Sequence, residues 1–447
     1  MTSFIENSCE GQIQRNRVTH RGGNHSQNAK NESYVNRVTK ARFLLIYMIM
    51  YLVFENLILR DLLFNVSITH AKYMRENFPS PTFDFICQAF SELGDKYGIG
   101  VVVLINYQVL DLPRSFTVSL VIAVSQGLIC MLKSFNNEPR PFFVHDLQPY
   151  KCRLEHGDPS GHAFIVTALY ATLVDMSLKE YQILRKHSKT IWSIYTFLIL
   201  FIGFGRIYNG VHTYNQVLTG YVWGFLIYYI ACYLLQPEIY QFIYSIKHKS
   251  LPQLIWNQLT QSYIVFYSIA VSLYFYGSTN HPTPQIWLDN IMKNCENVDL
   301  HVDPELQNFE KFNISILIIG TYIGICLEQH FSETNRYIQF HRTSFKITII
   351  RILVTLPGGF LFTNIFYLIS KNNPYWVILI FRTLTPMITG NAYVYFISKY
   401  LAVKLELANL DTSMRLDEYF KLDGNTDSGN PAQGNRSRKF LKNQKSL

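Results

Sequence analysis

The sequence predicts an all-α fold, a polytopic membrane bundle of about ten transmembrane helices. Charged residues make up only 16% of the 447 residues, whereas hydrophobic residues make up 49%. This composition excludes a disordered chain, which has few apolar residues and high charge. The 7 cysteines are too few for a disulfide-rich scaffold. The mean hydropathy is only +0.07, because the apolar residues are concentrated in blocks that polar connectors separate.

Nine or ten apolar blocks follow one another along the chain, and each is expected to form one helix. A transmembrane helix needs about 20 mostly apolar residues, whereas runs of about 10–14 are typical of buried helices in soluble proteins. The repetition of the blocks favours a membrane protein. In chain order they are Phe43–Phe54, Tyr97–Leu110 (the weakest), Phe116–Leu132, Ala163–Val174, Ile191–Gly205, Val217–Leu235, Tyr263–Tyr276, Ile314–Leu327, Ile347–Ile369 and Tyr375–Ile397.

The basic residues predict the orientation, because lysine and arginine are enriched in cytosolic loops. If the basic N-terminal tail is cytosolic and the chain crosses about ten times, the basic connectors 179–189, 247–249 and 336–346 are cytosolic too. The acidic connector 278–311 then lies outside, and both termini lie in the cytosol. Because this pattern accounts for most of the net charge of +9, no nucleic-acid partner is expected.

Four segments are expected along the chain. Residues 1–41 are a polar cytosolic tail, expected to be disordered, and residues 405–447 are a second polar cytosolic tail. Residues 42–236 form a core with an N-terminal helix, and its polar motifs lie between 133 and 216. Residues 237–404 supply additional transmembrane helices in which no signature is visible.

Three polar clusters occur at the ends of predicted spans, where functional residues of membrane proteins are found. The first is Lys133–Pro141, the second Pro159–His162 and the third Gly205–Gln216. The first two flank one outer loop, and the spans between the second and third form one hairpin. The predicted topology therefore places all three clusters at the same, non-cytosolic face of the membrane.

The residue types in these clusters suit a phosphate ester. Lys133, Arg140 and Arg206 supply three cationic donors. Ser160 and Gly161 open a predicted helix, whose free backbone N–H groups favour an anion.

His162 and His212 suit the roles of general acid and nucleophile. Nearby cations are expected to keep one imidazole neutral. The sequence has no paired His/Cys spacing and no carboxylate cluster that would predict a metal site, so neither a metal nor a cofactor is expected.

Each of these residues alone has an ordinary structural explanation. Arginine and lysine after a span often anchor the helix at the interface, and a lone histidine at a helix end is often a cap. The three clusters together, in order and on one face, favour a site.

At this point the sequence resembles the membrane-bound branch of the type-2 phosphatidic acid phosphatase superfamily, which includes glucose-6-phosphatase and vanadium haloperoxidases. The signature of that family is Lys-x6-Arg-Pro, then Pro-Ser-Gly-His, then Ser-Arg-x5-His-x3-Asp. Here Lys133 to Pro141 matches the first part, Pro159–His162 the second, and Arg206 to His212 the third. Gly205 replaces the serine and Gln216 replaces the aspartate.

The resemblance implies a six-helix phosphatase core and a role for each matching residue. His212 is implied as the catalytic nucleophile that forms a phosphohistidine, and His162 as the catalytic acid that protonates the leaving alcohol. The phosphate-binding residues implied are Lys133, Arg140, Ser160, Gly161 and Arg206. The family needs no metal.

Gln216 stands where the family signature has an aspartate that orients the histidine. A glutamine carbonyl accepts the same hydrogen bond without a charge, so orientation is retained while some electrostatic stabilisation is lost. The segment from Arg206 to Gly220 is similar to the glucose-6-phosphatase and dolichyl-diphosphate phosphatase versions, which also carry glutamine. The length and span count are similar to those of sphingoid-base-phosphate phosphatases, which keep the aspartate.

The sequence therefore predicts an integral-membrane, metal-independent phosphomonoester phosphatase of lipid metabolism, with its active site in the lumen. The expected substrate is a lipid phosphate, such as phosphatidate or a sphingoid-base phosphate. Glucose-6-phosphatase and polyprenyl-diphosphate phosphatase are the alternatives of the same chemistry, and a catalytically silent helper or transporter is the alternative of another class.

Membrane lipids are expected as neighbours, and no obligatory protein partner is evident. Lys445, near the C-terminus, partly matches a dilysine retrieval signal and favours the endoplasmic reticulum or another endomembrane. Cys152 and Cys295 fall in the same compartment, but the sequence leaves their pairing open.

Overall fold

The computed structural model describes residues 39, 42–248, 252–253, 256–295, 304–331, 336–337, 343–370, 373–408 and 414–415. Contacts divide the chain into Leu44–Leu422 and a second unit of Met1–Phe43 with Asp423–Leu447. The elements described below lie in the first unit. The exception is Arg42 and Phe43, the first two residues of the helical stretch Arg42–Asn77. The predicted tails, 1–41 and 405–447, lie almost entirely outside the described residues, so the disorder of the first stays a prediction.

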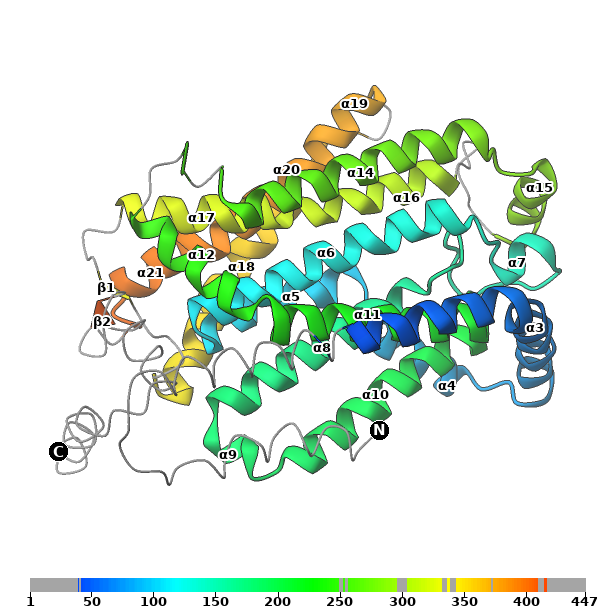
Figure 1. Cartoon of the computed structure of the whole chain (residues 1–447), viewed down its shortest axis with the longest axis horizontal. Helices are drawn as coiled ribbons and strands as arrows, with labels where there is room; N and C mark the ends of the chain where they lie inside the picture. The colour runs from blue at the N-terminus through cyan, green and yellow to red at the C-terminus, as the bar shows by residue number, and fades with distance from the viewer. Residues whose placement is uncertain are drawn as a thin grey trace. The chain divides into compact units, whose positions relative to one another are not determined.

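The described residues are helical apart from their connectors and one antiparallel pair of two-residue strands, β1 (Arg336–Tyr337) and β2 (Met414–Arg415) (Figure 1). The helices are η1 (Glu55–Leu59), α3 (Arg60–Asn77), α4 (Pro81–Glu92), α5 (Lys96–Val109), α6 (Leu112–Asn136), α7 (Pro141–Val144), α8 (Gly161–Glu180), α9 (Gln182–Arg185), α10 (Ser188–Tyr208), α11 (Tyr214–Tyr229), η2 (Ile230–Leu234), α12 (Gln236–His248), α14 (Gln258–Asn280), α15 (Gln285–Asn294), α16 (Pro304–Phe312), η3 (Asn313–Ile316), α17 (Leu317–Phe331), α18 (Phe345–Asn364), η5 (Ile365–Leu368), α19 (Tyr375–Val377), η6 (Ile378–Leu384), α20 (Thr385–Ala392), η7 (Tyr393–Ile397) and α21 (Ser398–Lys404).

Seven helical stretches among the described residues are long and apolar enough to cross a membrane. This confirms the predicted class, a polytopic helical membrane protein. The weakest predicted block, now α5, forms a shorter apolar helix over Tyr97–Val109. The seven stretches are Arg42–Asn77, Leu112–Val144, Gly161–Glu180, Ser188–Tyr208, Tyr214–Leu234, Gln307–Glu328 and Phe345–Asn364.

The last predicted block is an interrupted helix rather than a regular one. It consists of α19, η6, α20, η7 and α21, and both η6 and η7 have π-helical hydrogen bonding. Pro386 lies in the first turn of α20 and has no backbone N–H, so a carbonyl in the preceding turn loses its usual α-helical donor. The wider turn of η6 directly precedes this proline.

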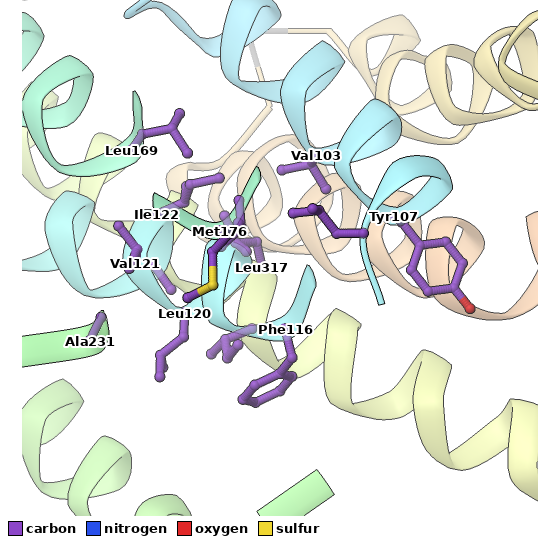
Figure 2. Packing of buried hydrophobic residues seen from close by; sticks show 14 of the residues in the cluster. Val103, Tyr107, Phe116, Leu120, Val121, Ile122, Leu169, Met176, Ala231 and Leu317 are labelled. Atoms are coloured by element: carbon purple, nitrogen blue, oxygen red, sulfur yellow. The ribbon is translucent and has the colours of Figure 1, made fainter. Parts of the chain in front are cut away.

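The central helix of the bundle is α6, which packs against α8 on one side and against α14, α16 and α17 on the other (Figure 1). Val121 and Ile122 of α6 are almost completely buried. Figure 2 shows them close to Leu169 and Met176 of α8 and to Leu317 of α17. In a membrane such packing is stabilised by van der Waals contact, because lipid tails are as apolar as the side chains. This packing holds the helix that leads into the first polar cluster.

Two glycines of α11 allow a very close approach to α8. A Cβ at Gly220 would lie 2.8 Å from the carbonyl oxygen of Ser160, and one at Gly224 would lie 2.6 Å from that of Phe164. Small residues four apart on one helix face let two transmembrane backbones touch. The contact brings the beginning of α8 next to the beginning of α11, where the second and third polar clusters lie.

The buried Arg351 joins three parts of the chain on the side of α18. Its guanidinium donates to the side-chain and backbone oxygens of Gln108 at 3.1 and 2.9 Å, and to Thr343 Oγ1 at 2.8 Å. It also donates to the carbonyl oxygen of Leu407 at 3.2 Å. These neutral acceptors hold α5, α18 and the end of α21 together.

Candidate active site

The three polar clusters meet at one place in the fold. Helix α6 ends at Asn136, and the next residue, Asn137, adopts a left-handed conformation with φ of 46°. The turn brings Arg140 to the start of α11, where its Nη1 lies 3.1 Å from His212 Nε2. The backbone N–H of Ser160, which precedes α8, donates to the carbonyl oxygen of Gln216 at 2.9 Å.

The protonation of the His212 ring follows from its neighbours. Gln216 Nε2 donates to the carbonyl oxygen of Pro139 at 2.9 Å, which only accepts, so the orientation of the amide is determined. Gln216 Oε1 therefore faces His212 Nδ1, at 3.0 Å, and also accepts from the backbone N–H of Thr213 at 3.3 Å. His212 must then carry its proton on Nδ1, which leaves the lone pair on Nε2.

The surroundings of His212 keep the ring neutral. Its side chain is buried, with 1% exposure. Burial lowers the pKa of His212 well below its usual value, and the positive charges of Arg140, Arg206 and Lys133 lower it further. The hydrogen bond that His212 Nδ1 donates to Gln216 Oε1 opposes this lowering of the pKa and is the weaker effect. A neutral imidazole with its lone pair on Nε2, which here faces Arg140 Nη1, is the form that acts as a nucleophile.

Glu155, in the loop before α8, holds the two cations of the first cluster. Arg140 donates from Nη2 to Glu155 Oε1 at 2.8 Å and from Nε to the Glu155 carbonyl oxygen at 2.6 Å. Lys133 Nζ lies 3.7 Å from the same Oε1 and donates to the carbonyl oxygen of His156 at 2.5 Å. Burial alone would raise the pKa of Glu155, but Lys311, Arg140, Lys133 and Arg153 together hold it well below the usual range.

Three polar atoms of the second and third clusters are buried without a hydrogen-bond partner among the described residues: Ser160 Oγ, His162 Nε2 and Arg206 Nε. Arg206 donates from Nη1 to Ser91 Oγ of α4 at 2.7 Å. His162 lies within reach of the positive charge of Arg206. Buried polar atoms that are left unpaired are costly, so their presence in one region indicates a place for a polar ligand.

Gly157, in the loop before α8, and Gly161, the first residue of α8, differ in the space around them. A Cβ at Gly157 would lie 2.4 Å from Gln216 Nε2, so only glycine fits beside the amide that orients His212. A Cβ at Gly161 would meet only Ile129 Cγ2, at 3.5 Å. The protein therefore leaves room at the Cβ position of Gly161.

Three buried carboxylates, those of Glu138, Glu55 and Asp158, lie near Asn215. Asn215 Nδ2 donates to Glu138 Oε1 at 2.9 Å and to Glu55 Oε1 at 3.3 Å. Arg60 lies 3.3 Å from Glu55 and 3.7 Å from Asp158. Burial raises the pKa of Asp158 well above its usual value, and the nearby charges of Glu138 and Glu55 raise it further.

The sequence did not predict the residues that contact the three polar clusters from other helices, because those residues come from segments with no recognisable motif. Ser91 is in α4, and Glu305 in α16 accepts from Ser134 Oγ at 2.8 Å and lies 2.8 Å from His156 Nε2. The open question of the cysteines is answered, since Cys152 and Cys295 are disulfide-bonded. In the part of the chain that the structure describes, no three His, Cys, Asp or Glu side chains are placed to hold a metal ion.

Comparison with known proteins finds similarity in the part of the chain that contains the three polar clusters. The PAP2 superfamily profile matches residues 115–240. Phosphatidylglycerophosphatase B of Bacillus subtilis (strain 168) is 28% identical over 112 residues, which is 25% of this chain and 53%, about half, of the relative's length. A crystal structure of a transmembrane PAP2-type phosphatidylglycerolphosphate phosphatase from Bacillus subtilis matches with a TM-score of 0.37 and 20% identity, covering 43% of this chain and 94% of that chain. The residues that match the PAP2 superfamily, 115–240, contain every residue of the three polar clusters.

Proposed function

We propose that this protein is an integral-membrane phosphatase that hydrolyses a phosphomonoester through a phosphohistidine on His212. The observation that carries the proposal is the arrangement around His212. Gln216 Oε1 is 3.0 Å from Nδ1, and Arg140 Nη1 is 3.1 Å from Nε2. The nucleophilic nitrogen thus lies beside a cation that suits a phosphate oxygen.

The reaction has two steps. In the first, the Nε2 lone pair of His212 attacks phosphorus, an N–P bond forms, and the bond to the leaving oxygen breaks. His162 donates a proton to that oxygen, so an alcohol leaves. In the second, water attacks phosphorus, His162 takes the proton from the water, and the N–P bond breaks to release inorganic phosphate. Lys133, Arg140, Arg206, Ser160 and the Gly161 amide hold the phosphoryl oxygens in both steps.

Gln216 supports an active site rather than a silent one. Its Oε1 keeps the Nδ1 proton of His212 in place, and its Nε2 bond to Pro139 prevents the amide from turning over. A neutral acceptor provides this orientation without the charge of an aspartate. The alternative of a catalytically silent helper or transporter has no observation in its favour at this position.

We propose a lipid phosphate as the substrate, with phosphatidate, a sphingoid-base phosphate or phosphatidylglycerophosphate as the candidates. The site lies at the ends of membrane helices, where an amphiphile can reach it from the bilayer. The match to phosphatidylglycerophosphatase B supports a lipid substrate. Glucose 6-phosphate and a polyprenyl diphosphate are the rivals that share this chemistry.

We further propose ten spans, both termini in the cytosol, and a site on the opposite face. The count adds α5, α14 and the interrupted helix from α19 to α21 to the seven long stretches. The Cys152–Cys295 disulfide lies in the connectors on the side of the site, and disulfides form in oxidising compartments. Location in the endoplasmic reticulum stays a prediction from the sequence.

The test is phosphate release by the purified full-length protein from phosphatidate, a sphingoid-base phosphate, phosphatidylglycerophosphate, a polyprenyl diphosphate and glucose 6-phosphate. His212→Ala should abolish release, while His187→Ala, at an exposed position before α10, should leave it unchanged. Release from none of the five substrates would reject an enzyme of this class. Release that persists in His212→Ala would reject the phosphohistidine route.

A further inference from the structure

Helix α16 lies outside the residues that match the PAP2 superfamily and yet presents three polar side chains to the end of α6 and to the loop before α8. Glu305, Asn308 and Lys311 are three residues apart, so they share one face of the helix. Asn308 Nδ2 donates to Ser134 Oγ and to the carbonyl oxygen of Cys130, both at 2.7 Å. Figure 1 shows α16 beside α6, which ends at the first polar cluster.

Lys311 is the member of this face that contacts the charged part of the site. Its Nζ lies 2.6 Å from Glu155 Oε2. The other carboxylate oxygen, Oε1, accepts from Arg140 and lies 3.7 Å from Lys133. Glu155 thus has one oxygen toward the phosphate-binding cations and one toward α16, and its side chain is only 8% exposed.

The segment that carries Lys311 is firmly attached to the loop. The disulfide joins Cys152, three residues before Glu155, to Cys295 at the end of α15. Asn294 donates to the carbonyl oxygens of Phe142 and His145, each at 3.0 Å. Glu305 adds its contact with His156 at 2.8 Å. Lys311 therefore follows residues that contact this loop and its neighbours at Asn294, Cys295 and Glu305.

The charges explain what Lys311 adds. A substrate phosphate needs Arg140 and Lys133, and both now share their charge with the buried Glu155 carboxylate. If substrate drew these cations away and no other partner remained, a buried charge would be left uncompensated, which is strongly unfavourable. Lys311 lies on the other carboxylate oxygen, Oε2, and keeps the carboxylate compensated. Among the surrounding positive charges, that of Lys311 lowers the pKa of Glu155 the most.

We propose that Lys311 is a positioning residue of the active site, which acts through Glu155 to orient Arg140 and to free Arg140 and Lys133 for the substrate phosphate. This inference rests on the proposed function and extends it, since it makes a helix outside the residues that match the PAP2 superfamily part of the site. It also gives the additional transmembrane segment a role in the reaction.

The test compares Lys311→Met, which removes the charge at similar length, with Lys311→Arg, which keeps it. The matched control is Lys293→Met, because Lys293 pairs with Asp146 at 3.0 Å while both side chains are 64% or more exposed. We expect Lys311→Met to lower kcat/KM about 10- to 100-fold, because it removes one partner of a largely buried ion pair. Lys311→Arg should restore most of the loss, and the control should match the wild type.

Two further readouts separate positioning from support of the fold. In Lys311→Met, Glu155 loses its strongest counter-charge, so the acid limb of the pH–activity profile should move to higher pH. In the Glu155→Gln background, adding Lys311→Met should change kcat/KM by less than about twofold, since no charge remains to compensate. If Lys311→Met does not fold, Lys311→Gln takes its place in the pH–activity profile and in the Glu155→Gln background. Lys311→Gln is also uncharged, and its amide keeps a donor to Glu155.

The outcomes distinguish this inference from the function on which it rests. An active wild type with an insensitive Lys311→Met, an unmoved acid limb, or an equal loss in the Glu155→Gln background would each overturn the role of Lys311 alone. A wild type that releases no phosphate from any of the five substrates would reject the proposed function and this role together.

Discussion

The orientation of His212 by a neutral amide is the feature of the proposed mechanism that a single substitution tests best. Gln216→Met keeps nearly the same side-chain volume and removes three contacts. These are Oε1 with His212 Nδ1 at 3.0 Å, Oε1 with Thr213 N at 3.3 Å, and Nε2 with the Pro139 carbonyl oxygen at 2.9 Å. The nucleophile then loses the acceptor that holds its proton on Nδ1.

The size of the effect follows from the charge that develops on the ring. With His212 neutral, the Nδ1–H bond to Gln216 contributes about 0.5–1.5 kcal/mol, and when phosphorylation of Nε2 makes the ring cationic it contributes about 1.5–3 kcal/mol. The transition state therefore loses about 1–1.5 kcal/mol more than the free enzyme, or roughly 5- to 15-fold in kcat/KM. Three buried groups left unpaired should also lower the melting temperature.

The assay measures phosphate release at several temperatures below the melting transition of each variant. The matched control is Gln126→Met, since Gln126 of α6 makes only a 3.5 Å contact with Cys130 Sγ and should tolerate the change. Gln216→Glu keeps the acceptor for His212 and Thr213 and should be more active than Gln216→Met. Wild-type kcat/KM in Gln216→Met, within twofold, would refute the reasoning, and so would a glutamate variant no better than the methionine one.

Three other predictions concern stability. Gly224→Leu should lower the melting temperature markedly, because its Cβ would lie 2.6 Å from a backbone oxygen of α8. The control Gly100→Ala has open space around its Cβ and should be neutral or slightly stabilising. Equal melting temperatures of the two variants would contradict the close contact. The raised pKa of Asp158 means that its stability contribution is present at low pH and lost as pH rises through that pKa. Asp158→Asn should therefore gain melting temperature relative to wild type between pH 5 and pH 8, and a gain at the acid end instead would reverse this sign. Cys152→Ser and Cys295→Ser should each destabilise by about 2–5 kcal/mol and should not add in the double variant; additive losses would show that the two cysteines are not paired.

The sequence could predict which residues of the proposed active site lie together, for a physical reason. Lys133, Arg140, His162, Arg206 and His212 lie within one stretch of the chain, on or next to the ends of consecutive helices. In a membrane, helices of similar length run back and forth, so the order of the spans already determines which helix ends share a face. The cationic and histidine side chains at those ends then indicated the chemistry.

The sequence by itself thus determined the helical membrane class and the position of the polar clusters, and it predicts phosphate chemistry for their residues. Only the tertiary structure decided what surrounds them. Glu155 and Lys311 are 156 positions apart in number and lie 2.6 Å apart in space, and Cys152 and Cys295 pair across a separation of 143. Such contacts depend on how α16 packs against α6. Packing between transmembrane helices depends on small residues and shape, so no local pattern predicts it. The proton on His212 Nδ1 was likewise undecided until the Gln216 amide was seen between Pro139 and His212.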